Sequence, residues 1–367
     1  MKVLCDREKL REGLAVLNTV VPTKTTKAVL SNVCLVATEE ALELVGTDLD
    51  VAVRYRISDD VKVEEPGTVV VPARVTFDFV RDLSGETVVL DAGESRCVLR
   101  AGEDACELVM ADADEFPVVA RFEESGSCSI QAGSFTALVG RTVFAAAREQ
   151  GRYAMHGVLT EVEEHSLRMV ATDGRRLAVA SAPLEAPQAL DRPVIVPTKG
   201  MQLFCRVVRD PLDQVRLAFS ESQVGFKTPQ AEVFARLIDG EFPRYSAVIP
   251  RDSTHRVEAD AELFARKLRL VANLTGEEAR AVRLSFQDGQ MEVFGQSAGR
   301  GEAHAHMAVD YRGEVAEIAF NPDYVLEGVK NCEGGRLLLE FNERTSPGKF
   351  QLGENYVYVV MPITIDA

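Results

Sequence analysis

A motif that recurs at domain-sized intervals constrains this chain of 367 residues more than any other feature. The segment ATDGRRLAVA occupies residues 171–180, and related segments begin at Gly46 (GTDLDVAV) and Phe294 (FGQSAGRGEAHA). The first related segment begins 125 residues before the motif, and the last begins 123 residues after it. These offsets have the size of a domain, so the sequence predicts three tandem copies of one unit.

Prolines in matching sequence contexts support the repeat. Pro197 follows Pro72 by 125 residues, Pro243 follows Pro117 by 126, and Pro362 follows Pro243 by 119. The alternative, a shared order of strands and helices with accidental spacing, leaves these matched contexts unexplained. We therefore interpret the chain as a true repeat.

Polar linkers separate the copies at residues 121–128 and 250–256, so we expect domains at 1–125, 126–250 and 251–367. Each copy combines short strand patterns with two segments of helical periodicity. The helices are predicted at residues 6–21, 73–83, 133–149, 198–210, 260–271 and 321–332. Runs of strands interrupted by isolated helices predict an α+β fold, in which each domain has antiparallel sheets with two helices on one face.

Composition narrows the cellular setting. The chain is 46% hydrophobic and has no run of 18 uncharged apolar residues, which predicts globular domains without a membrane span. Residues 1–9 are charged, unlike a signal peptide, so we expect a cytoplasmic protein. Seven cysteines without a C-x-x-C pair argue against a disulfide framework and a zinc ribbon, and we predict reduced thiols in the core.

Basic residues are concentrated on the predicted helices, although the net charge of the chain is −16. Their helical spacing places them on one stripe of each helix. The stripes contain Arg74 and Arg81; Arg141, Arg148 and Arg152; and Lys199, Arg206 and Arg209. Such a stripe is often only a solvated helix face. Its repetition in so acidic a chain favours a surface that attracts DNA phosphates while the remainder repels them.

Two other classes of function are open alternatives. An enzyme would use Asp173, Arg175 and Arg176, but a TDG turn already has a structural reason, because Asp bonds the backbone and Gly supplies a positive φ. No phosphate-binding loop, dinucleotide fingerprint or nucleophile elbow occurs, so we predict no catalytic residue and no cofactor. His304 and His306 share one side of a strand without a third ligand nearby, so we predict no metal site. A repeat adaptor that binds only proteins is the second alternative.

A specific set of motifs follows in a fixed order through the second and third copies. Y-x-x-x-G at 153–157 precedes TDG-x-RLA at 172–178, VP-x-KG at 196–200, DG-x-FP-x-Y at 239–245 and YVVMP at 358–362. Together with the three copies, this set resembles the bacterial DNA polymerase III β subunits, the sliding clamps, over essentially the whole chain. The resemblance implies three DNA-clamp domains per subunit, helices that line a hole, and two subunits that close into a ring head to tail.

The same resemblance implies a processivity factor, an accessory subunit of a DNA-directed DNA polymerase with no catalytic site of its own. The implied partners are double-stranded DNA bound without sequence preference, a second copy in a homodimer, the DNA polymerase III alpha subunit, the clamp loader, and other polymerases and repair proteins with clamp-binding motifs. The implied location is the cytoplasm, in association with the nucleoid.

Helix dimensions agree with a dimer. Helices ~10 Å wide leave a hole of ~9 Å when six surround it and ~28 Å when twelve do. A duplex is wider than ~17 Å, which is twice the depth of its major groove. One chain therefore cannot encircle DNA, whereas two can.

Residues at the family's functional positions form three groups. Those expected to contact DNA are Lys24, Arg74, Tyr153 and Lys199, together with Arg148, Arg152 and Arg206 from the basic stripes. For Tyr153 the alternative is a packed aromatic side chain. The second group corresponds to the family's peptide groove between the second and third domains. Its members are Met155, Thr172, Gly174, Arg175, Arg176, Leu177, Pro243, Val248, Ser346, Val359, Val360, Met361 and Pro362.

An apolar wall in that groove would bury one aromatic or leucine anchor of a partner. Leu177, Val248, Val360 and Met361 would form this wall, and packing in the core is the alternative for each aliphatic side chain. Arg175 stands where the family often has His, and Ala247 replaces a basic residue. Ser346 lies in a variable stretch. No peptide preference is therefore predicted.

The third group lies at the implied subunit contact. Glu103 and Asp104 of one copy would face Arg300, His304 and His306 of the other, and Leu274 is a further contact residue. The charges are complementary, although their signs are exchanged relative to the familiar family pattern. We hypothesise that protonated histidines strengthen the dimer, so that association weakens as pH rises.

Overall fold

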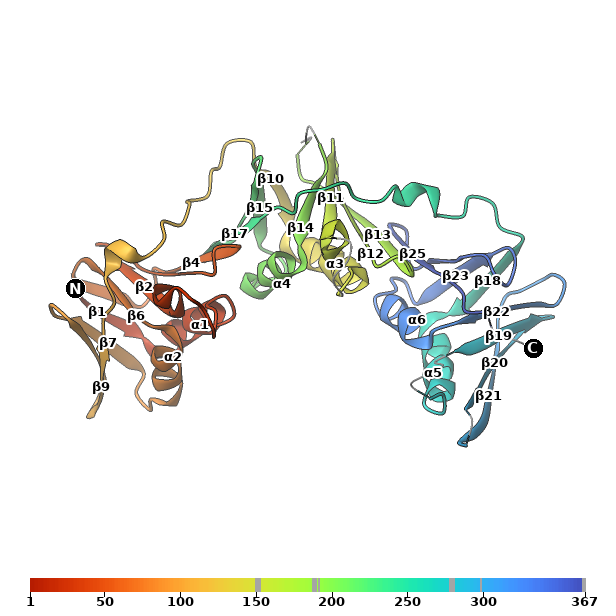
Figure 1. The fold of residues 1–367 in the computed structure, drawn as a ribbon, viewed down its shortest axis with the longest axis horizontal. Coiled ribbons are helices and arrows are strands. Elements are labelled where there is room, and N and C mark those ends of the chain that lie inside the picture. Colours follow the sequence, from red (N-terminus) through yellow and green to blue (C-terminus); the bar gives the residue numbers. More distant parts are fainter. Residues whose placement is uncertain (149–152, 187–189, 191, 277–280, 298, 365–367) are drawn as a thin grey trace. The chain divides into compact units, whose positions relative to one another are not determined.

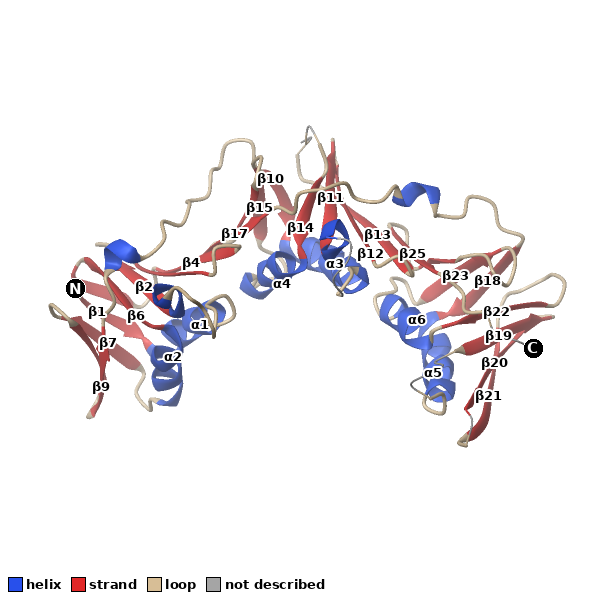
Figure 2. Cartoon of the chain, viewed as in Figure 1, coloured by secondary structure: helices blue, strands red, loops and turns tan. Residues whose placement is uncertain are grey.

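The computed structural model describes residues 1–367 apart from 149–152, 187–189, 191, 277–280, 298 and 365–367. Six α helices occur among the described residues, two in each copy of the repeat (Figures 1 and 2). They are α1 (Arg7–Leu17), α2 (Ala73–Asp82), α3 (Ala132–Thr142), α4 (Thr198–Val207), α5 (Ala261–Ala272) and α6 (Pro322–Val329). Each lies within two residues of the start predicted from the sequence.

The strands repeat with the helices. The first copy contains β1 (Lys2–Asp6), β2 (Asn32–Ala37), β3 (Leu42–Thr47), β4 (Val51–Ile57), β5 (Val61–Glu65), β6 (Gly67–Pro72), β7 (Thr87–Ala92), β8 (Arg96–Ala101) and β9 (Asp104–Val109). The second contains β10 (Cys128–Gln131), β11 (Gly157–Glu163), β12 (Ser166–Thr172), β13 (Arg176–Pro183), β14 (Val194–Pro197), β15 (Gln214–Phe219), β16 (Gln223–Lys227) and β17 (Ala231–Arg236). The third contains β18 (His255–Asp260), β19 (Val282–Gln287), β20 (Gln290–Ser297), β21 (Gly301–Ala308), β22 (Ala316–Phe320), β23 (Arg336–Phe341), β24 (Gly348–Gln351) and β25 (Tyr356–Val360).

Side-chain caps fix where helices begin. The carboxylate of Asp6 accepts a hydrogen bond from the backbone N–H of Lys9, as the sequence predicts, and Asp260 accepts one from Leu263 in the same way. These bonds satisfy N–H groups that have no partner inside the first helical turn. The starts of α1 and α5 are therefore set by residues that directly precede the apolar pattern.

The prediction of helix α3 was wrong at its carboxyl end. We expected a helix to residue 149, but the α helix ends at Thr142 and a short 3₁₀ turn follows. The hydroxyl of Thr142 donates to the carbonyl of Leu138, and the N–H of Ala147 donates to the carbonyl of Met155. A bond to a residue further along the chain thus replaces the next helical turn, and local periodicity does not contain that information.

The first compact unit consists of residues 1–133 and 199–237. It holds a five-stranded sheet in the order β5-β1-β7-β8-β9 and an eight-stranded sheet in the order β10-β15-β16-β17-β4-β3-β2-β6. Helices α1 and α2 lie side by side, and α1 packs on β3 and β4 (Figure 1). Its inward residues Leu10, Leu14 and Leu17 are buried, as their spacing predicts.

The second compact unit consists of residues 134–198 and 238–367. Its eight-stranded sheet has the order β14-β11-β12-β13-β25-β24-β23-β18, and its four-stranded sheet has the order β21-β20-β19-β22. Helices α5 and α6 lie side by side, and α5 packs on β20 and β21 (Figure 2). All paired strands in both units are antiparallel, as predicted.

Two strand pairings join successive copies of the repeat. We call the pairing of β4 with β17 the first seam and the pairing of β13 with β25 the second seam. At the first seam Val53 lies opposite Val233, and at the second Leu177 lies opposite Val359. Each eight-stranded sheet therefore continues from one copy into the next, which is why the two compact units divide the residues of the middle copy between them.

The prediction of reduced cysteines in the core holds for four of the seven. All seven thiols are free, and Cys5, Cys34, Cys97 and Cys128 are buried, whereas Cys106, Cys205 and Cys332 are half-buried. Within the described ranges, no helix has the length and apolar character needed to cross a bilayer.

Candidate functional site

The TDG turn connects β12 to β13 and is held by its own side chains. The carboxylate of Asp173 accepts hydrogen bonds from the N–H groups of Arg175 at 2.9 Å and Arg176 at 3.0 Å. The hydroxyl of Thr172 donates to the carbonyl of Arg176 at 2.6 Å. Gly174 has a φ of +86°, which favours glycine. The structural explanation predicted for these residues is confirmed.

Arg176 connects this turn to helix α6. Its side chain is only 6% exposed and pairs with Asp173 at 3.0 Å and with Glu327. The same guanidinium donates to the carbonyl of Phe144 at 2.8 Å and lies over the ring of Tyr324 at 4.5 Å. Burial opposes the charge, but the bond to Glu327 prevails and raises the pKa of Arg176. Its donors are engaged within the protein, so we assign it a positioning role.

The turn also lies against the carboxyl-terminal YVVMP segment. The N–H of Met361 donates to the carbonyl of Arg175 at 2.8 Å, and Arg176 lies opposite Val360 in the second seam. The side chain of Arg175 is exposed, and one of its nitrogens lies 3.5 Å from the hydroxyl of Tyr324. Two segments that the sequence analysis assigned to one site are therefore adjacent.

An apolar layer underlies this region. Its buried members are Leu159, Val170, Leu177, Ile195 and Val359. Half-buried side chains pack against it from the 238–249 segment, from neighbouring strands and from the 3₁₀ turn before β11: Ala154, Val179, Ile238, Phe242, Tyr245, Ile249 and Val357. The structure therefore brings the TDG turn, the DG-x-FP-x-Y motif and the carboxyl-terminal strand to one surface.

The predicted apolar residues of the groove differ in their exposure to solvent. Leu177, Val359 and Val360 are buried, whereas Val248 is 52% exposed and Met361 is 43% exposed. A partner can therefore reach Val248 and Met361 directly, while Leu177 and Val359 belong to the layer beneath. Val360 lies opposite Arg176 on the other face of the sheet, so its predicted place in the wall was wrong. We define Val248 and Met361, with the half-buried side chains around them, as the apolar surface of the second seam.

The remaining predicted groove residues take different places. Met155 is buried, and its terminal methyl would lie 3.7 Å from a Cβ added at Gly174, so it supports the turn from below. Pro243 and Pro362 are half-buried. Ser346 lies in the loop between β23 and β24, where its N–H donates to the carbonyl of Glu343.

Phe242 and Tyr245 belong to this surface, but the predicted residues did not include them. The Tyr245 hydroxyl donates to Glu161 at 2.8 Å. Burial and that hydrogen bond raise the pKa of Tyr245 to about 12, so the phenol stays neutral and holds its segment on the sheet. The DG-x-FP-x-Y motif contained the signal, because its two aromatic residues accompany Pro243.

The predicted DNA-facing cations fall into two classes. Lys24, Arg74, Arg148 and Arg206 are exposed, and none forms an ion pair with another residue in the described part of the chain. Lys199 is exposed but pairs with Asp48, in the first-copy turn that matches the TDG turn. Arg152 lies outside the described residues. Tyr153 is the first residue of the 3₁₀ turn Tyr153–His156, and only the backbone of Tyr153 is described.

Helix α5 carries cations that the predicted residues did not include. Arg266, Lys267 and Arg269 line a shallow hollow on its outer face together with Leu263, Leu270 and Asn273. Leu270 is among the most exposed large apolar residues of the chain. The net positive charge of residues 260–271 was the available sequence signal, but none of the recognised motifs lies on this helix.

The predicted interface residues lie at two sheet edges. Glu103 and Asp104 are exposed at the start of β9, which ends the five-stranded sheet. Strand β21 ends the four-stranded sheet and carries His304 and His306, both exposed, while Arg300 directly precedes it. Leu274 is half-buried just after α5.

His304 already has carboxylate neighbours within the chain. Its Nδ1 lies 2.7 Å from Glu292, and its Nε2 lies 3.8 Å from Glu302. The hydrogen bond with His304 lowers the pKa of Glu292. The edge formed by β21 thus carries both imidazoles and carboxylates, of which only the cations were predicted to take part in the contact.

All three copies of the repeat match domains of one protein family. Models of the DNA polymerase III beta subunit match the chain in order: the N-terminal domain at residues 1–120, the central domain at 129–244 and the C-terminal domain at 246–364. The chain belongs to the DNA polymerase III beta subunit family. It is therefore a DNA sliding clamp, an accessory processivity factor, and the predictions of fold and function are confirmed.

Relatives agree over the full length. The beta sliding clamp of Pseudomonas putida is 32% identical over 368 residues, with 100% of both chains covered. The DNA polymerase sliding clamp of Bacillus subtilis superimposes with a TM-score of 0.95 at 27% identity and full coverage of both chains. A Pseudomonas aeruginosa clamp bound to griselimycin gives a TM-score of 0.93 at 30% identity, again with full coverage.

Proposed function

We propose that two copies of this chain close head to tail into a ring around duplex DNA, and that the apolar surface of the second seam holds partner proteins on that ring. The domains would span residues 1–125, 126–250 and 251–367. The proposal is carried by the repetition of the seams. Three copies form only two seams, so one copy of each of the two seam strands has no seam partner within the chain.

The unpaired edges follow from the order of the strands. β4 and β13 are matching strands in the first two copies, and both pair across a seam. The matching strand of the third copy is β21. The seam partner of β4 is β17, and that of β13 is β25. In the first copy, the strand that matches β17 and β25 is β9. In the described sheets β9 and β21 each have one neighbour only. A bare edge offers unpaired backbone groups, so β9 of one copy can pair with β21 of the next.

The side chains at these edges suit a contact between copies. Glu103 and Asp104 give the β9 edge negative charge, and Arg300 gives positive charge at the start of β21, where His304 and His306 add charge when protonated beside Glu292 and Glu302. Complementary charge fixes which edges meet and in which direction. Leu274 would add apolar contact nearby. We include these residues in the proposed subunit interface.

Association is expected to weaken as pH rises from 5.5 to 8. Histidine is the side chain that ordinarily changes its charge in this range, and β21 presents two histidines, while the pKa of Glu292 beside them is lowered by its hydrogen bond with His304. The attraction to Glu103 and Asp104 is therefore present at low pH and lost at high pH. Sedimentation equilibrium across this range measures the dimer dissociation constant. The double variant His304→Gln, His306→Gln should show a flat profile, and a flat profile in the unmodified chain would contradict the proposal.

DNA would contact exposed cations on α2 and α4, together with Lys24 in the loop after α1 and Arg148, which lies beyond the end of α3 and not on the predicted helical stripe. Lys24, Arg74, Arg148 and Arg206 have charges that no described residue neutralises, and Lys199 and Tyr153 complete the proposed set with Arg152. We add Arg266, Lys267 and Arg269 of α5. Contacts to phosphates carry no base specificity, so the ring can move along the duplex while enclosure retains it. The acidic remainder of the chain favours this one path for DNA.

Partners would bind at the apolar surface of the second seam. Val248 and Met361 expose apolar area, and Met361 is bonded through its backbone to Arg175, whose side chain is exposed; this combination accepts an aromatic or leucine anchor of a short segment. The proposed partners are the DNA polymerase III alpha subunit, the clamp loader, and other polymerases and repair proteins with clamp-binding motifs. The proposed location is the cytoplasm, at the nucleoid.

Retention on DNA circles tests the ring. After loading with the clamp loader and ATP, the chain should remain on nicked circular DNA through gel filtration in high salt. Cutting the circle should release it within the time of the column, because a ring slides off an end. An adaptor would not be retained on either form, and an enzyme or an ordinary DNA-binding protein would not distinguish the circle from the linear form. Equal loss from both forms would overturn the proposal.

A further inference from the structure

The first seam has a position that matches Val248, and the chain fills it with its own phenylalanine. Phe122 follows Phe116 by six residues, as Val248 follows Phe242, and both pairs begin in an E-F-P motif. Phe122 is 8% exposed, whereas Val248 is 52% exposed. The two seams therefore differ at the point where the second seam presents its apolar surface.

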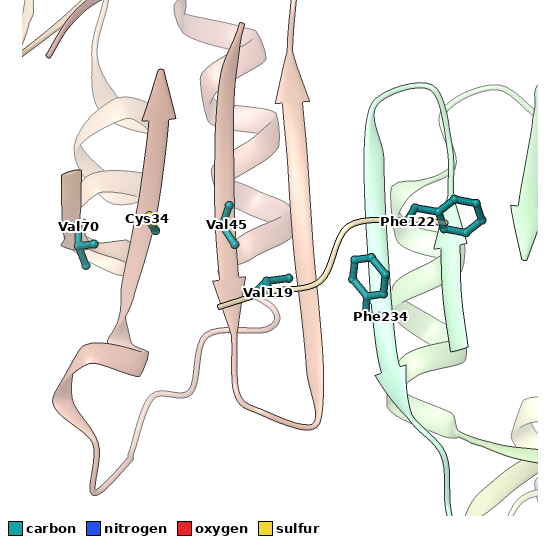
Figure 3. Packing of buried hydrophobic residues seen from close by; sticks show 6 residues of the cluster. All are labelled: Cys34, Val45, Val70, Val119, Phe122 and Phe234. Carbon is teal, nitrogen blue, oxygen red and sulfur yellow. The ribbon is translucent and has the colours of Figure 1, made fainter. Parts of the chain in front are cut away.

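The ring of Phe122 packs against β16 and β17. Figure 3 shows Phe122 and Phe234 in one cluster at the seam. A Cβ added at Gly225 would lie 3.1 Å from the Phe122 ring and 3.2 Å from the Phe234 ring, and Lys227 covers Phe122 at 5.7 Å. The position that matches Gly225 at the second seam is Lys349, opposite the strand residue that matches Phe234. Space for an aromatic ring thus exists at the first seam because the residue there is glycine.

Polar side chains of the first seam hold the backbone on both sides of the ring. Arg54 donates to the carbonyl of Val119 at 2.6 Å and to that of Ala120 at 3.0 Å. The N–H of Phe122 donates to Glu232 at 3.1 Å. These bonds satisfy backbone groups of an extended segment in the way that a bound peptide would require.

The second seam lacks this pair. Arg54 lies opposite Glu232, and the matching register position at the second seam holds Val179 opposite Val357. Two half-buried valines cannot bond a backbone, but they extend the apolar layer. The first seam therefore holds its linker through these polar bonds with Phe122 buried, whereas the second seam holds its own linker through Phe242, Tyr245 and Ile249 and leaves Val248 exposed.

We propose that the linker segment, residues 118–124, is an internal ligand of the first seam, with Phe122 in the place that a partner's anchor takes at the second. This inference rests on the proposed function of the second seam. It implies that each chain offers one open site for a partner rather than two, and that the first seam can accept a short extended peptide with an aromatic anchor once Phe122 is removed.

A peptide copy of the linker tests this inference in the full chain. The probe is a fluorescein-labelled synthetic peptide, EFPVVARFEE, that copies residues 115–124. Phe122→Ala should bind it at one site per chain, at least tenfold more tightly than the unmodified chain does. A control peptide with alanine in place of its second phenylalanine should bind at least tenfold more weakly. Hydrogen exchange of residues 118–124 should rise at least tenfold in the variant.

The inference would be overturned if Phe122→Ala bound the two peptides equally, or if the variant and the unmodified chain bound the linker peptide equally. Unchanged hydrogen exchange of residues 118–124 in the variant would also overturn it. Phe122→Leu provides a second route if Phe122→Ala fails to fold, because it removes the aromatic ring, keeps an apolar side chain beside Phe234 and leaves Gly225 in place for the ring of the peptide. A polymerase-derived peptide measures the second seam separately. Its affinity should fall in Val248→Asp and stay unchanged in Phe122→Ala, so failure of the proposed function is distinguishable from failure of this inference.

Discussion

Replacing Val248 or Met361 with aspartate is expected to weaken the binding of a polymerase-derived clamp-binding peptide by at least tenfold. Each side chain exposes about half of its surface, and an apolar anchor buried against it contributes ~2 kcal/mol that a carboxylate would remove. Because ~1.4 kcal/mol corresponds to a factor of ten, the double variant should lose about a hundredfold or more. Fluorescence anisotropy with a labelled peptide from the DNA polymerase III alpha subunit measures the affinity.

Leu212→Asp is the matched control. Leu212 is 75% exposed, and it lies in the first compact unit between α4 and β15. The same change of charge and apolar area should leave peptide affinity unchanged there. Leu177 would be a poor choice for this test, because it is buried in the layer and a polar replacement would disturb folding. Affinity that falls equally in Leu212→Asp, or that is unchanged in the double variant, would contradict the assignment of the site.

Arg176→Ala is expected to destabilise the second compact unit by about 2–4 kcal/mol, because breaking a buried ion pair leaves its partners uncompensated. Asp173 loses one bond, the carbonyl of Phe144 loses its donor, and Glu327 loses its cation. Exposure of Glu327 at 36% places the effect toward the lower end of that range. Calorimetry should show the corresponding transition several degrees lower.

Arg175→Ala is the neighbouring control for that experiment. Its side chain is exposed, and its contact with Tyr324 is 3.5 Å long. We expect its unfolding transition to stay within experimental error of the unmodified chain. If Arg175→Ala and Arg176→Ala lowered the transition equally, the proposed positioning role of Arg176 would be wrong.

Much of the fold could be predicted from the sequence because its signals are local or strictly periodic. The apolar spacing of Leu10, Leu14 and Leu17 defines a helix without reference to any other segment, and Asp6 caps it three residues from Lys9. The recurrence of one motif then gives the number of copies. The carboxyl end of α3 could not be predicted, because it depends on a bond between Ala147 and Met155.

The segments that form the candidate site could be predicted from the sequence, but the burial of each side chain could not. The motif identified the turn at Thr172 and the segment at Met361, which the structure places together. It could not tell that Val360 is buried, because burial arises when β25 pairs with β13, some 180 residues away in the chain. For the same reason, the sequence could not reveal that Glu327 pairs with Arg176 or that Asp48 pairs with Lys199, because each pair joins residues that are far apart in the chain.

The two seams have one further consequence. A row of copies joined by β9–β21 pairing has an unpaired β9 at one end and an unpaired β21 at the other. Each copy that is added pairs one of these edges and brings another edge of the same kind, so the pairing by itself does not end the row. Only the angle turned at each junction determines whether growth returns to its starting point. A substitution that alters this angle without weakening the pairing would therefore yield helical filaments in place of closed particles, and electron microscopy of concentrated samples would reveal them as long single files.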